Sequence, residues 1–440
     1  MAEPRRSQVR WLLVAWLFVL SAVSFLDRVN ISIAGSSIAA EYGLSNVQLG
    51  TVFSAFLFGY AMFQTLGGWL AERLGPRLVL GVGVLWWGAF TALTAMVSPK
   101  LTYALVIFVA VRFLLGAGEA VIFPASNQFL SRWIPSQEQG IANGLVFAGV
   151  GAGAFVTPPL IAYIMAHYGW RWSFWMSAGI GVLAGVVWYL LARDTPEKHP
   201  LVSAGELEHI RTGAKLAAPG SDGKAQTVGW GAILASKEVW AVTISYFSFG
   251  YVAWIFFSWF FIYLQKIRGL DLKTSAFYST LPFLAMAICS PLGGAISDRL
   301  TKSYGPRFGR CAISVLSLTL TAAFLVLGSR AENARVASVV LAGGAGALYL
   351  SQSSFWALTA GISRGSSGSV SGFMNTGCQL GGMLTAQLTP IIALRWNWTA
   401  PFFVAAVLAA LGAAAWLFVD PTRTLVAKDS VDIQIEKVPA

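Results

Sequence analysis

Charged residues are scarce in this chain. Lys, Arg, Asp and Glu make up 11% of the 440 residues, whereas 56% are hydrophobic and the mean hydropathy is +0.66. Soluble domains carry about 25% charged residues. A soluble fold of this composition would expose much of its apolar surface to water. The composition therefore indicates a membrane protein.

Cysteine and histidine are also rare. Each occurs three times, as Cys289, Cys311 and Cys378 and as His167, His199 and His209. The cysteines fall in or at the edge of apolar runs, which argues against a disulfide framework or a zinc site. The histidines fall outside those runs, which excludes a proton relay built from histidine. A Gly-rich phosphate loop and a Ser/His/Asp set are also absent. The sequence therefore predicts no enzymatic activity, no cofactor and no metal.

Twelve apolar runs are long enough to cross a bilayer as helices, which takes roughly 20 residues each. They cover residues 11–34, 46–70, 78–98, 101–124, 139–163, 171–193, 238–264, 273–299, 308–328, 335–360, 367–393 and 398–419. The first run resembles a signal peptide but continues past any cleavage point, so we interpret it as the first transmembrane helix.

One long polar segment, with a short helix expected around "SAGELEHIRTG", divides the runs six and six. The expected fold is all-α, with twelve transmembrane helices in two six-helix bundles related by a pseudo-two-fold axis. The expected boundaries are 1–193 for the N-terminal bundle, 194–237 for a cytoplasmic linker, 238–420 for the C-terminal bundle and 421–440 for a cytoplasmic tail.

The distribution of Lys and Arg predicts the orientation. With the N-terminus inside, 20 of the 30 basic residues lie on the inner side and 8 on the outer side. Positive charge is enriched in cytoplasmic loops. Both termini are therefore expected on the cytoplasmic side. The expected membrane is a bacterial inner membrane. One loop, "QKIRGLDLK", carries three basic residues although it is expected on the outer side.

A loop motif occurs twice, as "GGWLAERLGPR" and "GGAISDRLTKSYGPRFGR", about half a chain apart. Such a repeat is typical of transporters built from two related bundles. We expect Glu72 and Asp298 to pair with arginines or to cap neighbouring helices, and so to join span 2 to span 11 and span 8 to span 5 on the inner side. With Arg73 and Arg299 they form the predicted gate. The alternative is an ordinary positive loop.

The twelve spans, their division and this repeated loop resemble the major facilitator superfamily over nearly the whole chain. More narrowly, "FLDRVNISIAG", "GTVFSAFLFGYAMFQTLGGWLAERLG" and "RFLLGAGEAVIFPASNQFLSRWIPSQEQG" resemble its anion:cation symporter branch. That branch includes bacterial sugar-acid transporters and the vesicular glutamate and sialic acid carriers. The resemblance implies a transporter of organic anions.

Only four charged residues lie well within the spans: Asp27, Arg28, Arg112 and Glu119. Charges at that depth are costly and are functional by default. Arginine keeps its charge and matches a carboxylate, so Arg28 and Arg112 are predicted to bind the anion. A buried carboxylate can take up a proton, so Asp27 and Glu119 are predicted to carry the coupling protons. In the resembling family the span 4 arginine and the following acid have these roles.

Two questions about these charges stay open at this point. The four could instead form two buried ion pairs that only tie span 1 to span 4. Asp27 and Arg28 lie about 100° apart on one helix, so only one of them faces a central cavity squarely.

The second half has no charged residue well within its spans, so neutral polar residues are expected to bind the substrate there. The predicted substrate contacts are Tyr60, Ser353, Ser354, Trp356, Asn375 and Gln379, with Tyr251, Trp254 and Gln352 as further candidates. Hydrogen bonds between helices are the alternative for each. The branch often carries Tyr at the position of Phe25 and Gln at that of Val150. These departures imply a substrate that is smaller or less hydroxylated than an aldonate, or one that binds in a different pose.

The predicted function is proton-coupled uptake of an organic anion by alternating access, with a sugar acid such as a hexuronate, aldonate or aldarate as substrate. The alternatives are a proton-coupled antiporter that exports drugs or metabolites and a non-transporting membrane sensor. Sodium coupling is not excluded. The expected partners are the anion, protons and the lipid bilayer, without nucleic acid, and the expected oligomeric state is a monomer.

Overall fold

The structure, a computed structural model, describes residues 7–44, 46–217, 228–260, 263–270, 272–363 and 365–425. In the first half, six passes are formed by α1 (Val9–Tyr42), α2 (Asn46–Leu74), α3 (Pro76–Met96), α4 (Ala104–Glu119) with α5 (Ile122–Trp133), α6 (Gln139–Tyr168) and α7 (Trp170–Leu191). In the second half, six passes are formed by α10 (Lys237–Ser258), α12 (Leu272–Tyr304), η4 (Arg307–Ala312) with α13 (Ile313–Arg330), α14 (Ala334–Leu350) with α15 (Gln352–Ile362), α16 (Ser367–Arg395) and α17 (Ala400–Trp416). The prediction of twelve transmembrane helices is confirmed.

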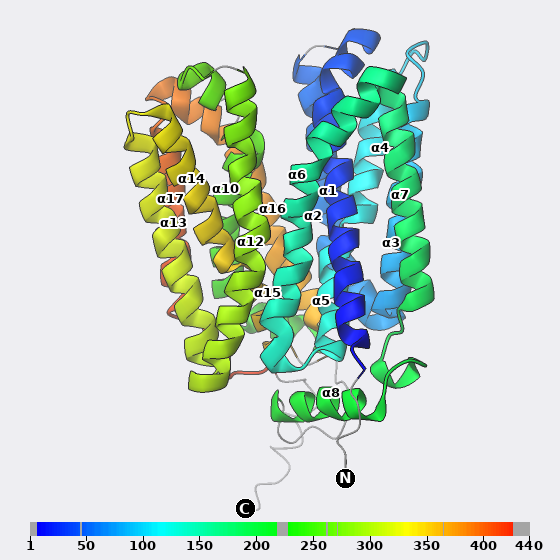
Figure 1. Cartoon of the computed structure of the whole chain (residues 1–440), viewed down its shortest axis with the longest axis vertical. Coiled ribbons are helices and arrows are strands. Elements are labelled where there is room, and N and C mark those ends of the chain that lie inside the picture. The colour runs from blue at the N-terminus through cyan, green and yellow to red at the C-terminus, as the bar shows by residue number, and fades with distance from the viewer. Residues whose placement is uncertain are drawn as a thin grey trace, which may run out of the picture.

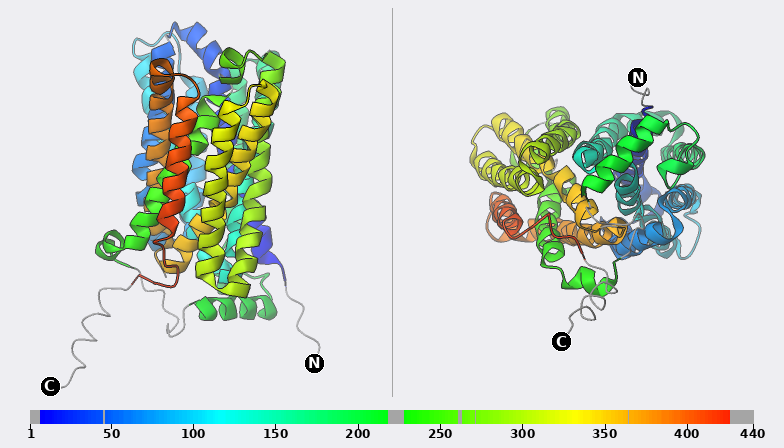
Figure 2. Two further views of the ribbon diagram at one scale, coloured as in Figure 1. Left: turned by 90° about the vertical axis from the view of Figure 1, so that its left-hand side faces the viewer. Right: turned by 90° about the horizontal axis from the view of Figure 1, so that it is seen from below.

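The two sets of helices stand side by side as two bundles (Figure 1; Figure 2, right). The short helix α8 (Ala204–Ala217) lies across one end of the first bundle, at the start of α1, and we call this the linker end. Nine helices in the described part of the chain are long and apolar enough to cross a membrane on their own. The chain is therefore a multi-pass membrane protein. The exact domain boundaries stay a prediction.

The predicted linker helix is present and is attached to the first bundle. Its Glu206 is fully buried and accepts hydrogen bonds from the backbone N–H groups of Val9 and Arg10, both at 3.1 Å. The same carboxylate pairs with the Arg10 guanidinium at 3.1 Å. A carboxylate at a helix N-terminus satisfies free backbone donors and complements the helix dipole. Glu206 thereby fixes α8 to the start of α1.

Among the described residues, the fourth and tenth passes are each divided into two helices, which the apolar runs did not predict. The fourth pass was expected to end near residue 124, but it continues as α5 to Trp133 after a break at Ala120 and Val121. Pro124 has no N–H to donate to Ala120, so the helix cannot continue through this point without loss of a hydrogen bond. The tenth pass breaks at Ser351, whose hydroxyl donates to Leu348 O at 2.7 Å. The two breaks occupy equivalent places in the two bundles.

Candidate functional site

Arg28 and Glu119 form a buried ion pair between α1 and α4. Arg28 Nε lies 2.6 Å from Glu119 Oε1, and the side chains are 9% and 0% exposed. Glu119 is the last residue of α4, directly before the break, so its carboxylate stands at mid-pass between the helices. The pair joins one of the predicted anion-binding residues to one of the predicted proton carriers.

Asp27 and Arg112 are equally buried, each 2% exposed, but they are not joined by an ion pair within 4 Å. Within the described part of the chain, neither carboxylate oxygen of Asp27 and neither Nε nor Nη1 of Arg112 has a hydrogen-bond partner. The two groups interact electrostatically with each other and with Glu119. Two unpartnered buried charges are costly. The purely structural alternative of two complete ion pairs therefore does not hold in this conformation.

Aromatic rings surround the guanidinium of Arg28. Its Cζ lies 4.3 Å from the ring centroid of Tyr60, 4.7 Å from that of Phe25 and 5.5 Å from that of Phe56. The Cζ of Arg112 lies 4.9 Å from the ring centroid of Phe56 as well. Ring faces attract a cation and exclude water from it. Arg28 is thereby kept charged and poorly hydrated, which favours binding of an anion.

A small cavity lies between the bundles, with a volume of about 50 Å³. Arg28 is the charged residue of its lining, while Asp27, Glu119 and the other predicted anion-binding residue, Arg112, are outside it. The open question of which member of the Asp27–Arg28 dipeptide faces the cavity is thus answered in favour of Arg28. Phe25 and Val150, the two departures from the sugar-acid pattern, also line it.

Among the predicted substrate contacts of the second half, the structure brings Asn375 and Gln379 to this cavity, together with the further candidates Trp254 and Gln352. Asn375 Nδ2 donates to Gln64 Oε1 of α2 at 2.5 Å, so it also joins the two bundles. Arg28 from α1 and the two amides of α16 therefore share one cavity, which is the geometry of a binding site between two moving halves.

Three further predicted contacts, Ser353, Ser354 and Trp356, make their hydrogen bonds within the second bundle. Ser353 Oγ donates to Ser290 O at 3.0 Å and Ser354 Oγ to Ser297 Oγ at 3.2 Å, both within the second bundle. Trp356 is 1% exposed and donates to the Tyr246 hydroxyl at 2.8 Å. The last of the predicted contacts is also outside the cavity lining: Tyr60 is fully buried, beneath Arg28, and its hydroxyl has no partner among the described residues.

Sequence reasoning missed part of the cavity wall. Tyr246 lines it and accepts hydrogen bonds from Gln352 Nε2 and Trp356 Nε1, both at 2.8 Å. Phe249 and Tyr349 line it as well. A tyrosine in an apolar run gives no signal of its direction. The one available clue was that Gln352 and Trp356, four residues apart, share a helix face with room for one common partner.

At the linker end each bundle caps a helix of the other, and we call these hydrogen bonds the linker-end contact. Glu72 Oε1 of α2 accepts from Ser369 N in the first turn of α16. Asp298 of α12 accepts from Gly140 N at 3.0 Å and Ile141 N at 2.7 Å in the first turn of α6. Carboxylates at helix N-termini are favourable. The structure thus contains the predicted joins of span 2 to span 11 and of span 8 to span 5.

The two arginines predicted beside these acids lie differently. Arg73 stacks on Trp69, with Cζ 4.6 Å from the ring, and Arg299 is exposed at the end of α12. The cation that pairs with Asp298 is Arg310, at 2.7 Å. Arg310 also donates to Ser136 O of the first bundle at 3.1 Å. Because Asp298 lies on the inward face of α12, its immediate neighbour in sequence points away from it.

Gln128 of α5 completes the linker-end contact and was not predicted. Its amide donates from Nε2 to Gly365 O at 3.0 Å and accepts at Oε1 from Gly368 N at 3.0 Å and from Ser367 Oγ. Gln128 is 1% exposed. A neutral amide near the end of an apolar run carries no charge signal, which explains why the sequence did not reveal it.

Close glycine contacts make this end compact, and they provide a test of the closed state. A Cβ on Gly68 would lie 2.0 Å from Gly368 O, whereas one on Gly179 of α7 would meet nothing within 4 Å. We expect Gly68→Val to hold the linker end open, so that a cysteine introduced at Ser131 reacts with a water-soluble maleimide at least about tenfold faster than in the parent. Gly179→Val is the matched control and should leave the rate unchanged. Equal rates in all three proteins would contradict the inferred closure.

A membrane protein of two related bundles, with charges at mid-membrane and a cavity between the halves, has the architecture of a secondary transporter. The chain belongs to the Major Facilitator Superfamily, whose family model matches residues 17–386. It is a transporter and not an enzyme.

Relatives and solved structures agree with this assignment. A probable sulfoacetate transporter, SauU, of Cupriavidus necator is 32% identical over 434 residues, which is 97% of each chain. A probable galactarate/D-glucarate transporter, GudP, of Bacillus subtilis is 31% identical over 304 residues, 68% of this chain and 67% of that one. The proton:xylose symporter XylE has the same fold, with a TM-score of 0.75 at 15% identity over 96% of this chain and 98% of that chain.

Proposed function

We propose that this transporter takes up an organic anion of the sugar-acid class, such as a hexuronate, aldonate or aldarate, together with protons. The observation that carries the proposal is the position of Arg28. It lines the cavity between the bundles while its guanidinium is held by Glu119 at 2.6 Å. A carboxylate of the substrate and the carboxylate of Glu119 therefore compete for one cation.

This competition links anion binding to proton binding. When Glu119 is ionised, it occupies Arg28, and removal of one partner from a buried pair costs about 3–5 kcal/mol. When Glu119 takes up a proton, Arg28 loses its partner and the anion can replace it. Asp27 and Arg112, which interact electrostatically with this pair, provide a second acid and a second cation for the same exchange. Proton and anion then bind together and leave together, which is symport.

A pH gradient then sets the direction of transport. The linker end is assigned to the cytoplasm because most Lys and Arg lie on that side. Because the contacts of Asp298 and Glu72 close this end, we infer that anion and proton reach the cavity from the outside. An acidic external medium loads Glu119 and favours uptake. The antiporter alternative requires a cavity for cations or apolar compounds, and Arg28 disfavours cations.

A second candidate substrate is a short-chain sulfonate or carboxylate. Phe25 and Val150 line the cavity with apolar surface at two positions where sugar-acid carriers place hydroxyl-binding groups. A site without such groups does not select a polyhydroxylated chain. The transporter of Cupriavidus necator, 32% identical, is described as a probable carrier of sulfoacetate, which agrees with a small anion.

The experiment that identifies the substrate is a thermal-stability screen of the purified transporter at pH 5.5 and pH 7.5. Hexuronates, aldonates, aldarates and two- to four-carbon sulfonates and carboxylates are compared. A ligand at about 100 times its Kd stabilises the folded state by about 2.7 kcal/mol, which gives a measurable rise in Tm. We expect stabilisation by one anion class, and more strongly at pH 5.5. Stabilisation by lipophilic cations alone would contradict the proposal.

A further inference from the structure

Two amide side chains join the bundles beside the central cavity. Asn375 of α16 lines the cavity, and its Nδ2 donates to Gln64 Oε1 of α2 at 2.5 Å. Gln64 is fully buried and lies outside the cavity lining. Among the α16 residues of the lining, Asn375 is the nearest in the chain to Ser369, which bonds to Glu72 at the linker end. The amide pair therefore lies between the cavity and the linker-end contact, and we call it the floor pair.

The helices α2 and α16 are in close contact at this level. A Cβ on Gly372 would lie 2.8 Å from Gln64 O and 3.0 Å from the Cα of Thr65. The hydroxyl oxygens of Thr65 and Thr376 form a second hydrogen bond between the two helices, at 3.2 Å. The halves of such a transporter rock against each other around the site. The floor pair and the threonine pair must therefore break when the linker end opens.

The floor pair is costly to break because both amides are buried. Asn375 is 3% exposed, and Gln64 Nε2 has no hydrogen-bond partner within the described part of the chain. The bond from Asn375 is therefore the one that fixes the Gln64 amide. A buried polar group that loses its partner changes an equilibrium constant about fivefold to 150-fold. This bond thus contributes both to the position of Asn375 at the cavity and to the closed state of the linker end.

The same face of α2 also reaches the cation of the site. Tyr60 lies four residues before Gln64, so the two side chains share one face of the helix. The Tyr60 ring lies beneath Arg28, whose Cζ is 4.3 Å from the ring centroid. One face of α2 thus contacts Arg28 from the first bundle and Asn375 from the second, which are the two sides of the proposed anion site.

We propose that Gln64 is a positioning residue of this transporter. It acts through Asn375, because one hydrogen bond holds the Asn375 amide at the cavity for the anion and also ties α2 to α16. Since one bond serves both purposes, anion affinity and closure of the linker end change together. The inference rests on the proposed function, because it assigns Asn375 to the anion.

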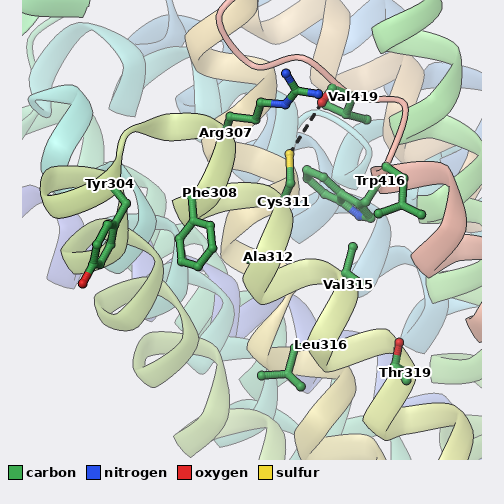
Figure 3. A pocket seen from close by; sticks show the side chains of 11 residues that line it. Tyr304, Arg307, Phe308, Cys311, Ala312, Val315, Leu316, Thr319, Trp416 and Val419 are labelled. Carbon is green, nitrogen blue, oxygen red and sulfur yellow. Dashed lines mark hydrogen bonds between the residues drawn. The ribbon is translucent and has the colours of Figure 1, made fainter.

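A larger groove, with a volume of about 820 Å³, lies on the surface of the second bundle between η4, α13 and the end of α17 (Figure 3). All of its lining residues belong to the second bundle, so it is separate from the floor pair. Thr319, labelled on its wall, is exposed. Thr319→Val is therefore a matched control for substitutions between the bundles.

Labelling without substrate tests the closing role of Gln64. A cysteine introduced at Ser131 of the full-length transporter is reacted with a water-soluble maleimide in the absence of the anion. We expect Gln64→Leu and Asn375→Leu each to raise the rate at least about fivefold. The double variant should react within about twofold of the faster single variant, because both substitutions remove the same bond. Thr319→Val should react like the parent. A parental rate in either correctly folded single variant would overturn the proposal.

Uptake kinetics in proteoliposomes test the positioning role, with the anion found by the stability screen. We expect Gln64→Leu to raise KM at least about fivefold, because Asn375 loses the bond that orients it. Thr65→Val loosens the same crossing without removing that bond, and neither Thr65 nor Thr376 lines the cavity, so its KM should stay within about twofold of the parent. The KM of the double variant should match that of Asn375→Leu within about twofold. Multiplied losses in the double variant would show that Gln64 does not act through Asn375.

The two measurements separate this inference from the proposed function. Faster labelling of Gln64→Leu, in a protein that transports no anion, would support the closing role of the floor pair and refute anion transport. A parental KM in Gln64→Leu, in a protein that accumulates the anion, would leave proton-coupled uptake intact and refute the role of Gln64.

Discussion

Arg28→Gln is expected to reduce uptake of the anion at least about 100-fold. The substitution removes the charged residue of the cavity lining and leaves Glu119, buried at 2.6 Å from its former partner, without a cation. Loss of one member of a desolvated charge pair costs 2–5 kcal/mol or more in binding. Arg28→Lys should also be impaired, because an ammonium matches neither the bidentate carboxylate nor the stacked rings of Phe25 and Tyr60. Initial uptake rates in proteoliposomes measure both effects.

Arg171→Gln is the matched control for this experiment. Arg171 is also paired with a glutamate, Glu41, at 2.7 Å, but it is 35% exposed and lies at the start of α7, on the side opposite the linker end. Solvent-exposed ion pairs contribute little to the stability of the folded protein. Uptake should stay within about twofold of the parent. Near-normal uptake by Arg28→Gln, with the protein correctly folded, would refute the assignment of Arg28 as the anion-binding residue.

Glu119→Gln is expected to separate anion movement from the proton gradient. Glutamine has the shape of protonated glutamate but cannot ionise, so Arg28 is permanently free to bind the anion. Exchange of labelled for unlabelled anion should continue within about threefold of the parent rate. Accumulation driven by an acidic exterior should fall to simple equilibration. Counterflow and gradient-driven uptake, measured on the same proteoliposomes, distinguish the two activities.

Asp27→Asn is measured in the same assay, because Asp27 is the other predicted proton carrier and interacts electrostatically with Glu119. Glu41→Gln, an exposed carboxylate of the side opposite the linker end, is the control and should accumulate normally. If Asp27→Asn and Glu119→Gln both accumulate the anion like the parent, neither carboxylate couples the proton.

The fold was predictable because a bilayer imposes length and polarity on each pass. Apolar runs of about 20 residues gave the twelve passes, and the repeated loop gave the two-bundle arrangement. The contacts made by Glu72 and Asp298 could be predicted from the same repeat, because the two acids occupy the same position in the repeated loop motif. The helix breaks were not predictable from hydropathy, since Ala120 and Ser351 lie within continuous apolar runs.

The candidate site was predictable in its charges and less so in its neutral groups. Four charges within apolar runs can hardly be overlooked, and all four lie on α1 and α4 as expected. Helical periodicity shows which residues share a helix face. It does not show whether that face lines the cavity or packs against a neighbouring helix of the same bundle. Ser353 and Ser354 therefore bond inside the second bundle, whereas Gln379 reaches the cavity. The arginine that pairs with Asp298 is Arg310, which the sequence did not single out.

The most direct test of the account is uptake by the purified transporter in proteoliposomes under an imposed pH gradient. The anion identified by the stability screen is supplied outside, in sodium-free medium, with an external pH of 5.5 and an internal pH of 7.5. We predict accumulation above the external concentration, abolished by a protonophore and unchanged by added sodium. Accumulation that ignores the pH gradient, or that requires a sodium gradient at constant pH, would contradict proton-coupled symport through Arg28 and Glu119.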